Sequence, residues 1–373
     1  MSRNMISPNI PASRFYRFAP TVILLAGFAF PCAGPPQATY ADRLVVNGTE
    51  YAGARIVAMQ RGRLRFRQAD GRLDEAWADE VDRIHVEHGG AFMDFNQAER
   101  LVAEGKMAAA IPRYTRSLRL VEDFWPDLIS IRLVKACDAT GDFDDAVEHF
   151  IRVLLGPHAG PTAAARIIPQ GVPTKRNAKV TRAMARIAAK LRGGSDVTDA
   201  QKALLRLLRY EILRHTGDEE TVAAARDVAT SAIPAAARST QAYAIVHHAL
   251  ETLLQSDPDE TLLEGLDAAI RDCPKESLAG FLLLKGKTLL RTAATQEDLV
   301  RAAWPLMRVA IHLGNDLLAP EALYEAATAL ERIGRKGQAA DLLRECREHR
   351  KVSAKTGALA KVASERLQST VTD

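Results

Sequence analysis

The chain has little of what disulfide-stapled or membrane-spanning proteins contain. Only 4 of its 373 residues are cysteine, and aromatic residues make up 6%. Its N-terminal apolar run, from Ala19 to Phe30, is 12 residues long, whereas a membrane-spanning helix needs about 20. The remaining composition, 47% hydrophobic and 26% charged, is that of an ordinary soluble protein of roughly two to three domains. Disorder throughout the chain is therefore excluded.

Catalytic and metal-binding motifs are also missing. No zinc-protease motif, phosphate-binding glycine loop, dinucleotide fingerprint or nucleophile elbow occurs. His85 and His88 bracket a turn, and His247 and His248 are adjacent and expected to point apart on a helix, so neither pair supplies three or four converging ligands. We therefore expect no catalytic, cofactor-binding or metal-binding residues.

The cysteines predict no disulfide framework. Cys137, Cys273 and Cys346 lie far apart, and each is embedded in a helical apolar pattern. We expect buried thiols that behave as small apolar side chains. A single bridge in an oxidising compartment is the alternative.

The first 41 residues have the order of a secretory signal peptide. They carry three arginines and no acidic residue, then the apolar run, then a proline-broken stretch ending in Thr39-Tyr40-Ala41. We predict cleavage after Ala41 and a periplasmic or secreted protein. Lipid attachment at Cys32 is disfavoured, because Phe30 and Pro31 stand where lipidation signals have small residues. Without its three signal arginines the chain, with 50 basic and 46 acidic residues in total, is nearly neutral.

Residues 42–90 predict a small β domain. Asn47-Gly48, Arg61-Gly62 and Asp70-Gly71 are turn dipeptides between short apolar alternations, which favours four or five antiparallel strands. Such a unit is too short for a sandwich, so we expect a small closed barrel. The pattern resembles Sm-like or bacterial Src-homology-3-like barrels.

One predicted strand of this domain, RLRFR, has two different faces. Leu64 and Phe66 are expected to point inward, and Arg63, Arg65 and Arg67 to line the opposite face. Three arginines in a row can bind phosphate or nucleic acid. An exported protein seldom meets nucleic acid, so nucleic acid is not an expected partner and a solvated strand face is favoured.

From residue 91 onward the pattern is helical and repeats. The segments that begin at Ala98 and Val134 align, with Gly105 and Gly141 36 residues apart, and a third copy contains Gly334. Each copy has an amphipathic helix, a turn on glycine, a small alanine five residues later and a large side chain four residues beyond it. These pairs are Ala110 and Tyr114, Ala146 and Phe150, and Ala339 and Leu343.

This arrangement resembles the tetratricopeptide repeat, in which helix pairs of about 34 residues stack into a solenoid. The family's first-helix aromatic and glycine are absent, since Asp94 and Ala98, then Ser130 and Val134, stand there. The predicted fold is mainly α: a helical-hairpin solenoid with a small N-terminal β-barrel. We expect two repeats over 91–155, a linker rich in proline and glycine over 156–173, degenerate helical repeats over 174–350, and a polar tail over 351–373 that frays or caps the solenoid.

The resemblance implies that a partner binds on the concave face, which the first helix of each pair lines. The family's lysine and asparagine clamp for a peptide carboxylate is absent, so an extended or helical protein segment is the expected partner. Alternatively, Phe92 and Phe95 pack on the barrel or cap the solenoid. The contact candidates are Phe92, Phe95, Glu99 and Val102; Leu128, Ile131, Lys135 and Asp138; and Glu321, Tyr324, Thr328 and Glu331.

A second candidate surface is a basic amphipathic helix that follows Thr174 and contains no acidic residue. Such a helix can lie on an anionic membrane, a wall polymer or an acidic partner, or it can be a core-facing helix with a solvated side. The candidate side chains are Lys175, Lys179, Arg182, Arg186 and Lys190. The expected function is therefore an exported, non-enzymatic scaffold that binds a partner protein or peptide. An envelope-associated module that docks through the basic helix is the alternative.

Overall fold

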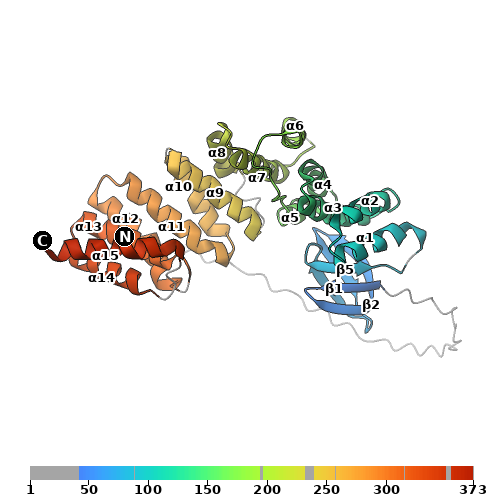
Figure 1. Ribbon diagram of the computed structural model, residues 1–373, viewed down its shortest axis with the longest axis horizontal. Helices are drawn as coiled ribbons and strands as arrows, with labels where there is room; N and C mark the ends of the chain where they lie inside the picture. The colour runs from blue at the N-terminus through green and yellow to red at the C-terminus, as the bar shows by residue number, and fades with distance from the viewer. Residues whose placement is uncertain are drawn as a thin grey trace, which may run out of the picture. The chain divides into compact units, whose positions relative to one another are not determined.

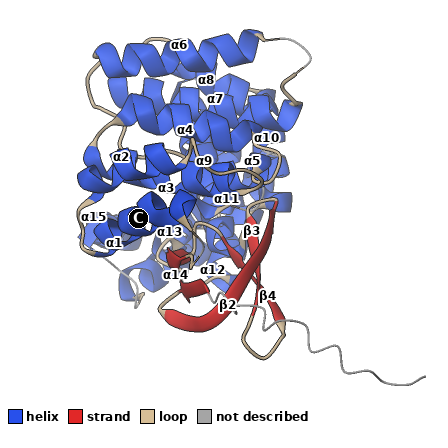
Figure 2. Cartoon of the chain, turned by 90° about the vertical axis from the view of Figure 1, so that its right-hand side faces the viewer, coloured by secondary structure: helices blue, strands red, loops and turns tan. Residues whose placement is uncertain are grey.

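The computed structural model describes residues 42–87, 89–193, 196–231, 239–256, 258–314, 316–349 and 354–372. The predicted signal peptide, its cleavage after Ala41 and the lipidation question at Cys32 lie outside these residues. Within them the protein is mainly α-helical, with one small antiparallel sheet near the N-terminus (Figures 1 and 2).

The sheet has five strands in the order β4-β3-β2-β1-β5. The predicted number and antiparallel direction of the strands are confirmed, but the predicted closed barrel is wrong. Within the described residues β4 pairs only with β3, and β5 only with β1. The strands are β1 (Asp42–Val46), β2 (Thr49–Gln60), β3 (Arg63–Arg67), β4 (Leu73–Trp77) and β5 (Val81–His85).

Two tight turns and an alternating strand form the sheet. Asn47-Gly48 and Arg61-Gly62 have positive φ at both positions, the conformation of the two-residue turn that suits twisted strands. In β3, Leu64 and Phe66 are buried as predicted, and the arginines point the other way. Arg63 and Arg65 form ion pairs with Glu75 of the neighbouring strand at 3.6 and 3.0 Å. The arginine face is therefore solvated and partly neutralised.

Fifteen α-helices follow among the described residues. The N-terminal group is α1 (Met93–Ala103), α2 (Met107–Ser117), α3 (Trp125–Thr140), α4 (Phe143–Leu155), α5 (Gly160–Ala164) and α6 (Ala178–Arg192). The middle group is α7 (Asp199–Thr216), α8 (Thr221–Ser231), α9 (Thr240–Ser256), α10 (Glu260–Asp272), α11 (Lys275–Thr292) and α12 (Gln296–His312). The last three are α13 (Ala319–Ile333), α14 (Lys336–Glu348) and α15 (Ala354–Thr372).

The three predicted glycine-turn hairpins are present. Gly105, Gly141 and Gly334 separate α1 from α2, α3 from α4 and α13 from α14, and each has a positive φ that favours glycine. The alanine and large side chain predicted to pack the second helix of each hairpin are all fully buried. These residues are Ala110, Tyr114, Ala146, Phe150, Ala339 and Leu343.

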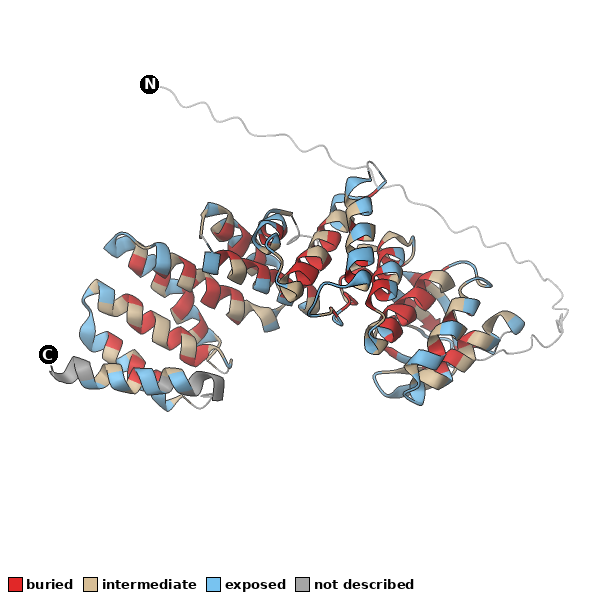
Figure 3. Ribbon diagram, turned by 45° about the horizontal axis from the view of Figure 1, so that its top comes forward, coloured by how far each residue is buried: buried red, intermediate tan, exposed pale blue. Residues whose placement is uncertain are grey.

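From α7 onward each odd-numbered helix contacts the next odd-numbered helix, besides its neighbours along the chain. Arginines join this row. Arg291 of α11 donates to the carbonyl of Leu254 in α9, and Arg332 of α13 donates to the carbonyl of Leu290 in α11 at 2.6 Å. Buried residues lie on the faces that the helices turn toward one another (Figure 3). No described helix combines the length and apolarity needed to cross a membrane.

The interval predicted as a linker is packed rather than free. It is irregular apart from the short α5, and Ala163, Ala164 and Ile168 in it are buried. Asp127 of α3 accepts hydrogen bonds from the backbone amides of His158 and Ala159, both at 2.9 Å. These contacts hold the interval against the preceding helices.

Candidate partner-binding surfaces

Most of the contact residues predicted on the first two helix pairs are buried inside the protein. Phe95, Glu99, Leu128 and Ile131 are at most 3% exposed, so the prediction that they line an open groove is wrong. The half-buried Phe92 packs edge-on against Trp125 with ring centroids 4.6 Å apart. Phe95 also contacts Phe92, Tyr114 and Trp125, so the two phenylalanines belong to one aromatic cluster among the first helices.

The outer edge of β5 takes its hydrogen-bond partners from helices instead of from another strand. The Asn96 side chain accepts from the Val86 amide at 2.9 Å and donates to its carbonyl at 2.7 Å. Glu99 accepts from the Ile84 amide at 2.7 Å. Arg132 donates to the Val81 carbonyl at 2.6 Å, and Lys135 donates to the Asp79 carbonyl just before the strand. Because an uncovered strand edge invites pairing with other chains, α1 and α3 protect this one.

Glu99 is the centre of this junction. Its carboxylate lies 3.1 Å from Nε of the buried Arg132 and accepts a hydrogen bond from the Tyr114 hydroxyl at 2.5 Å. Burial and the Glu99 charge raise the pKa of Tyr114, which therefore stays protonated as the donor. The sequence marks Glu99 as a partner contact, and the structure makes it a buried link between the sheet and three helices.

The contact residues predicted on the last hairpin are also engaged within the chain. Arg366 of α15 donates to Thr328 Oγ1 at 3.0 Å and forms an ion pair with Glu331. Its guanidinium lies 4.9 Å from the ring centroid of Tyr324. The tail, predicted to fray or to cap, is a helix over this surface, where α13, α14 and α15 lie together (Figure 1).

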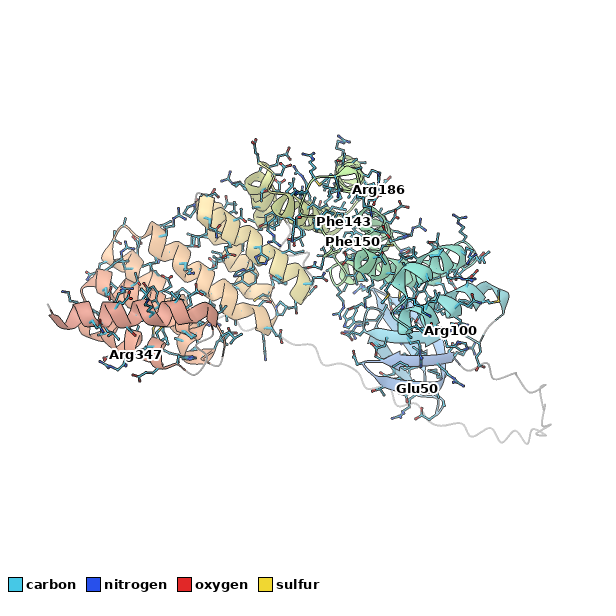
Figure 4. The ribbon with its side chains drawn as sticks, viewed as in Figure 1. Glu50, Arg100, Phe143, Phe150, Arg186 and Arg347 are labelled. Atoms are coloured by element: carbon cyan, nitrogen blue, oxygen red, sulfur yellow. The ribbon has the colours of Figure 1, made fainter. Side chains whose placement is uncertain are left out.

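The basic helix is α6, and most of its predicted patch is paired with α4. Lys179 meets Asp142 at 2.9 Å, Arg182 meets Asp144 at 2.7 Å, and Arg186 meets Glu148 at 2.7 Å. Figure 4 labels Arg186 beside the α4 residues Phe143 and Phe150. Lys175 and Lys190 are exposed and form no ion pair within the described ranges. The charge of α6 therefore serves largely to hold α4, which weakens the membrane-docking interpretation.

His149 of α4 predicts an acid sensitivity of this region. Burial, helped by nearby Arg152, lowers its pKa from 6.5 to about 4. The unfolded chain therefore binds a proton below pH 6.5 that the folded chain takes up only near pH 4. We expect this histidine to reduce stability by about 1.4 kcal/mol per pH unit as pH falls through that window.

Urea unfolding from pH 7.5 to 4 measures this effect. His149→Leu should remove this part of the loss, so that its stability falls less steeply than that of the unchanged chain below pH 6.5. At pH 7.5, where the histidine is neutral in both states, the variant reports the packing effect alone. Parallel curves for the two chains would contradict the assignment.

An exposed apolar surface lies elsewhere, in a groove over α10, α11 and α12 that sequence reasoning missed. The cavity volume is about 610 Å³. Trp304 and Ile311 of α12, which line it, are 75% and 67% exposed. This α10–α12 groove is also lined by Leu263, Asp267 and Ile270 from α10; Leu282, Lys285 and Leu289 from α11; and Arg301, Pro305, Met307, Arg308 and His312 from α12.

Close packing joins two of the helices that line the groove. Gly286 of α11 leaves no room for a side chain, because an added Cβ would lie 2.4 Å from atoms of the buried Leu306. Lys285 forms an ion pair with Asp267 and so joins α11 to α10. Leu299, Ala302, Leu306 and Val309 bury the opposite face of α12. The helix is thus apolar on two faces, only one of which is covered, and this pattern was readable in the sequence.

By contrast, the cavity bordered by α9, α11 and α13 contains several charged side chains, and these have partners. It has a volume of about 420 Å³ and includes Glu251, Lys287, Arg291 and Arg332. The two arginines are those that bind the last turns of neighbouring helices, and Lys287 forms an ion pair with Glu321. These side chains hold the helix row together, which leaves fewer of them available for a ligand.

The histidine and cysteine expectations have mixed outcomes. His247 and His248 were expected to point apart. In the structure, one possible ligand atom of each lies within 4.8 Å of the other and of a carboxylate oxygen of Glu251. All three residues belong to α9. The three described cysteines are free thiols. Cys137 and Cys346 are buried as predicted, and burial raises their pKa values to about 12 and about 11; Cys273 is half-buried.

No protein-family model matches the chain, and no curated protein or solved structure matches it either. The described contacts alone therefore define this protein as a mainly helical chain whose N-terminal helices hold a small open sheet.

Proposed function

We propose that this protein is an exported, non-enzymatic scaffold that holds a partner protein through the α10–α12 groove. The observation that carries the proposal is the exposure of Trp304 and Ile311 on one helix, in a cavity of about 610 Å³ lined by α10, α11 and α12. Contiguous exposed apolar surface is uncommon on monomeric proteins and marks interaction sites. Tryptophan is also the residue type that most often dominates binding energy.

The helical contacts favour a repeat architecture of the tetratricopeptide kind. Three hairpins share the glycine turn and buried alanine, and the odd-numbered helices from α7 form a row joined by arginines. Stacked helix pairs expose long surfaces to which protein segments bind. In this chain the predicted contact residues at both ends meet its own elements, β5 at one end and α15 at the other. The middle helices are therefore the better place for a partner.

Charge selects the kind of segment that fits the groove. Arg301 and Arg308 lie beside Trp304 on the exposed side of α12, and Arg308 forms no ion pair with any described residue. The one carboxylate among the lining residues, Asp267, is paired with Lys285. An amphipathic helix fits this arrangement, with apolar side chains on Trp304 and Ile311 and carboxylates facing the arginines.

Trp304→Ala is expected to weaken partner binding by at least about 2 kcal/mol, or roughly 30-fold in Kd, because an anchoring aromatic ring is lost. Proteins captured from an envelope fraction by the mature chain identify candidates. Titration of each candidate with tryptophan emission as the readout then tests the groove, since burial of the exposed Trp304 shifts its emission.

The matched control is Leu120→Ala, which removes another large side chain that is 59% exposed but lies outside the groove. It should bind as the unchanged chain does. A captured protein that binds all three chains equally, with no shift in emission, would show that the groove is not the binding site.

A further inference from the structure

A second cavity of about 610 Å³ lies between the sheet and α1, and it is basic where the α10–α12 groove is apolar. Four of its lining side chains are Arg43 from β1, Arg83 and His85 from β5, and Arg100 from α1. Figure 4 labels Arg100 on α1 beside the strands. We call this cavity the arginine pocket.

The walls of the arginine pocket are fixed by the contacts that cover β5. Arg43 of β1 lies directly opposite His85 of β5. Arg83 is two residues before His85 on the same strand, so its side chain is on the same face. On the other wall, Asn96 is held by both backbone groups of Val86, and Glu99 by the Ile84 amide. Hydrogen bonds thus join the strand and the helix beside the cavity. Ligand binding therefore does not need to order these elements.

The balance of charge in the pocket is positive. Neither Arg43 nor Arg83 forms an ion pair within the part of the chain that the structure describes, and Arg100 meets only the exposed Glu104, at 3.4 Å. Of the two carboxylates that line the cavity, Glu99 is compensated by Arg132. Glu87 is the other. Arg132 itself is buried, and its Nη2 has no hydrogen-bond partner among the described residues.

We propose that the arginine pocket binds an anion that carries a phosphate group. Arginine presents a planar set of donors that matches phosphate oxygens, and it keeps its charge at any physiological pH. Arg43 and Arg83 supply this recognition from adjacent strands, with Arg100 closing the third side. The site is independent of the α10–α12 groove. The anion would therefore bind at the sheet and not at α6, whose basic side chains form ion pairs with acidic residues.

Calorimetric titration with inorganic phosphate tests the pocket. The double variant Arg43→Gln/Arg83→Gln should bind phosphate at least about tenfold more weakly, because two charged hydrogen-bond donors are lost. Arg119→Gln/Arg192→Gln removes the same charge from two exposed arginines outside the pocket, and it should bind as the unchanged chain does. Circular dichroism verifies that both variants fold, and the single change Arg83→Gln serves if the double variant does not.

Vesicles of phosphatidylglycerol and of phosphatidylcholine distinguish the source of the phosphate. Binding of both inorganic phosphate and the anionic vesicles, lost in the pocket variant, points to a lipid headgroup. Binding of inorganic phosphate alone points to a soluble phosphate ligand. The proposal is overturned if neither probe binds, or if the pocket and control variants lose binding equally.

Discussion

Glu99→Ala is expected to lower the free energy of unfolding by about 3–5 kcal/mol, the largest single-residue effect that we predict. The change leaves the buried Arg132 without its counter-charge. It also removes the acceptor of the Tyr114 hydroxyl and of the Ile84 amide. Breaking one half of a buried ion pair costs far more than the pair contributes, because the remaining charge stays out of water.

Urea unfolding monitored by circular dichroism measures this loss, and hydrogen exchange at the Ile84 amide locates it. Glu104→Ala, at the exposed residue that follows the same helix, is the control and should leave stability nearly unchanged. Glu99→Gln keeps the shape and one acceptor, so its effect should fall between the two. If Glu99→Ala unfolds at the same urea concentration as Glu104→Ala, the carboxylate does not hold the sheet to the helices.

Local chemistry explains which parts of the fold were predictable. The hairpin turns at Gly105, Gly141 and Gly334 follow from a conformation that glycine adopts readily. The inward direction of Leu64 and Phe66 follows from the period of a strand. The closed barrel failed because closure depends on partners distant in sequence. The edge of β5 is covered by Asn96 and Arg132, which no strand pattern reveals.

The candidate contact residues show a different limit of sequence reasoning. The family positions do mark residues that make contacts, but at both ends the contact is within the chain: Glu99 and Lys135 bind the edge of the sheet, and Thr328 and Glu331 bind Arg366. A repeat pattern identifies a binding face without identifying what covers it.

The basic face of α6 and the exposed face of α12 show that a sequence pattern does not reveal which face of a helix is covered. The basic face of α6 looked free because its acidic partners belong to α4, more than 30 residues earlier. Conversely, Trp304 on α12 was not singled out by the sequence, although the structure leaves it 75% exposed on a helix that is apolar on two faces. In each case the amphipathic pattern is local, whereas exposure is decided by which helix packs on which face.

Gly62→Ala is expected to destabilise the contact between the sheet and α5 by about 2–5 kcal/mol. The φ of Gly62 is +79°, and an added Cβ would lie 2.5 Å from Cβ and 3.1 Å from Cα of Ala163. The Gly62 amide also donates to the His158 carbonyl at 3.0 Å. The turn between β2 and β3 therefore cannot move away from α5 without breaking this hydrogen bond.

The chain provides a control that separates backbone strain from crowding at this position. Gly71 has a φ of +88° with no atom within 4 Å of an added Cβ, so Gly71→Ala should cost only the strain, about 1–2 kcal/mol. A double-mutant cycle with Ala163→Gly then isolates the crowding, which the smaller residue should relieve in part. Equal losses for Gly62→Ala and Gly71→Ala, with no coupling to position 163, would mean that α5 does not press on the turn. Unequal losses with coupling would mean that α5 holds the β2–β3 turn in place. The open sheet would then have two restraints, this one and the Glu99 contact at its β5 edge.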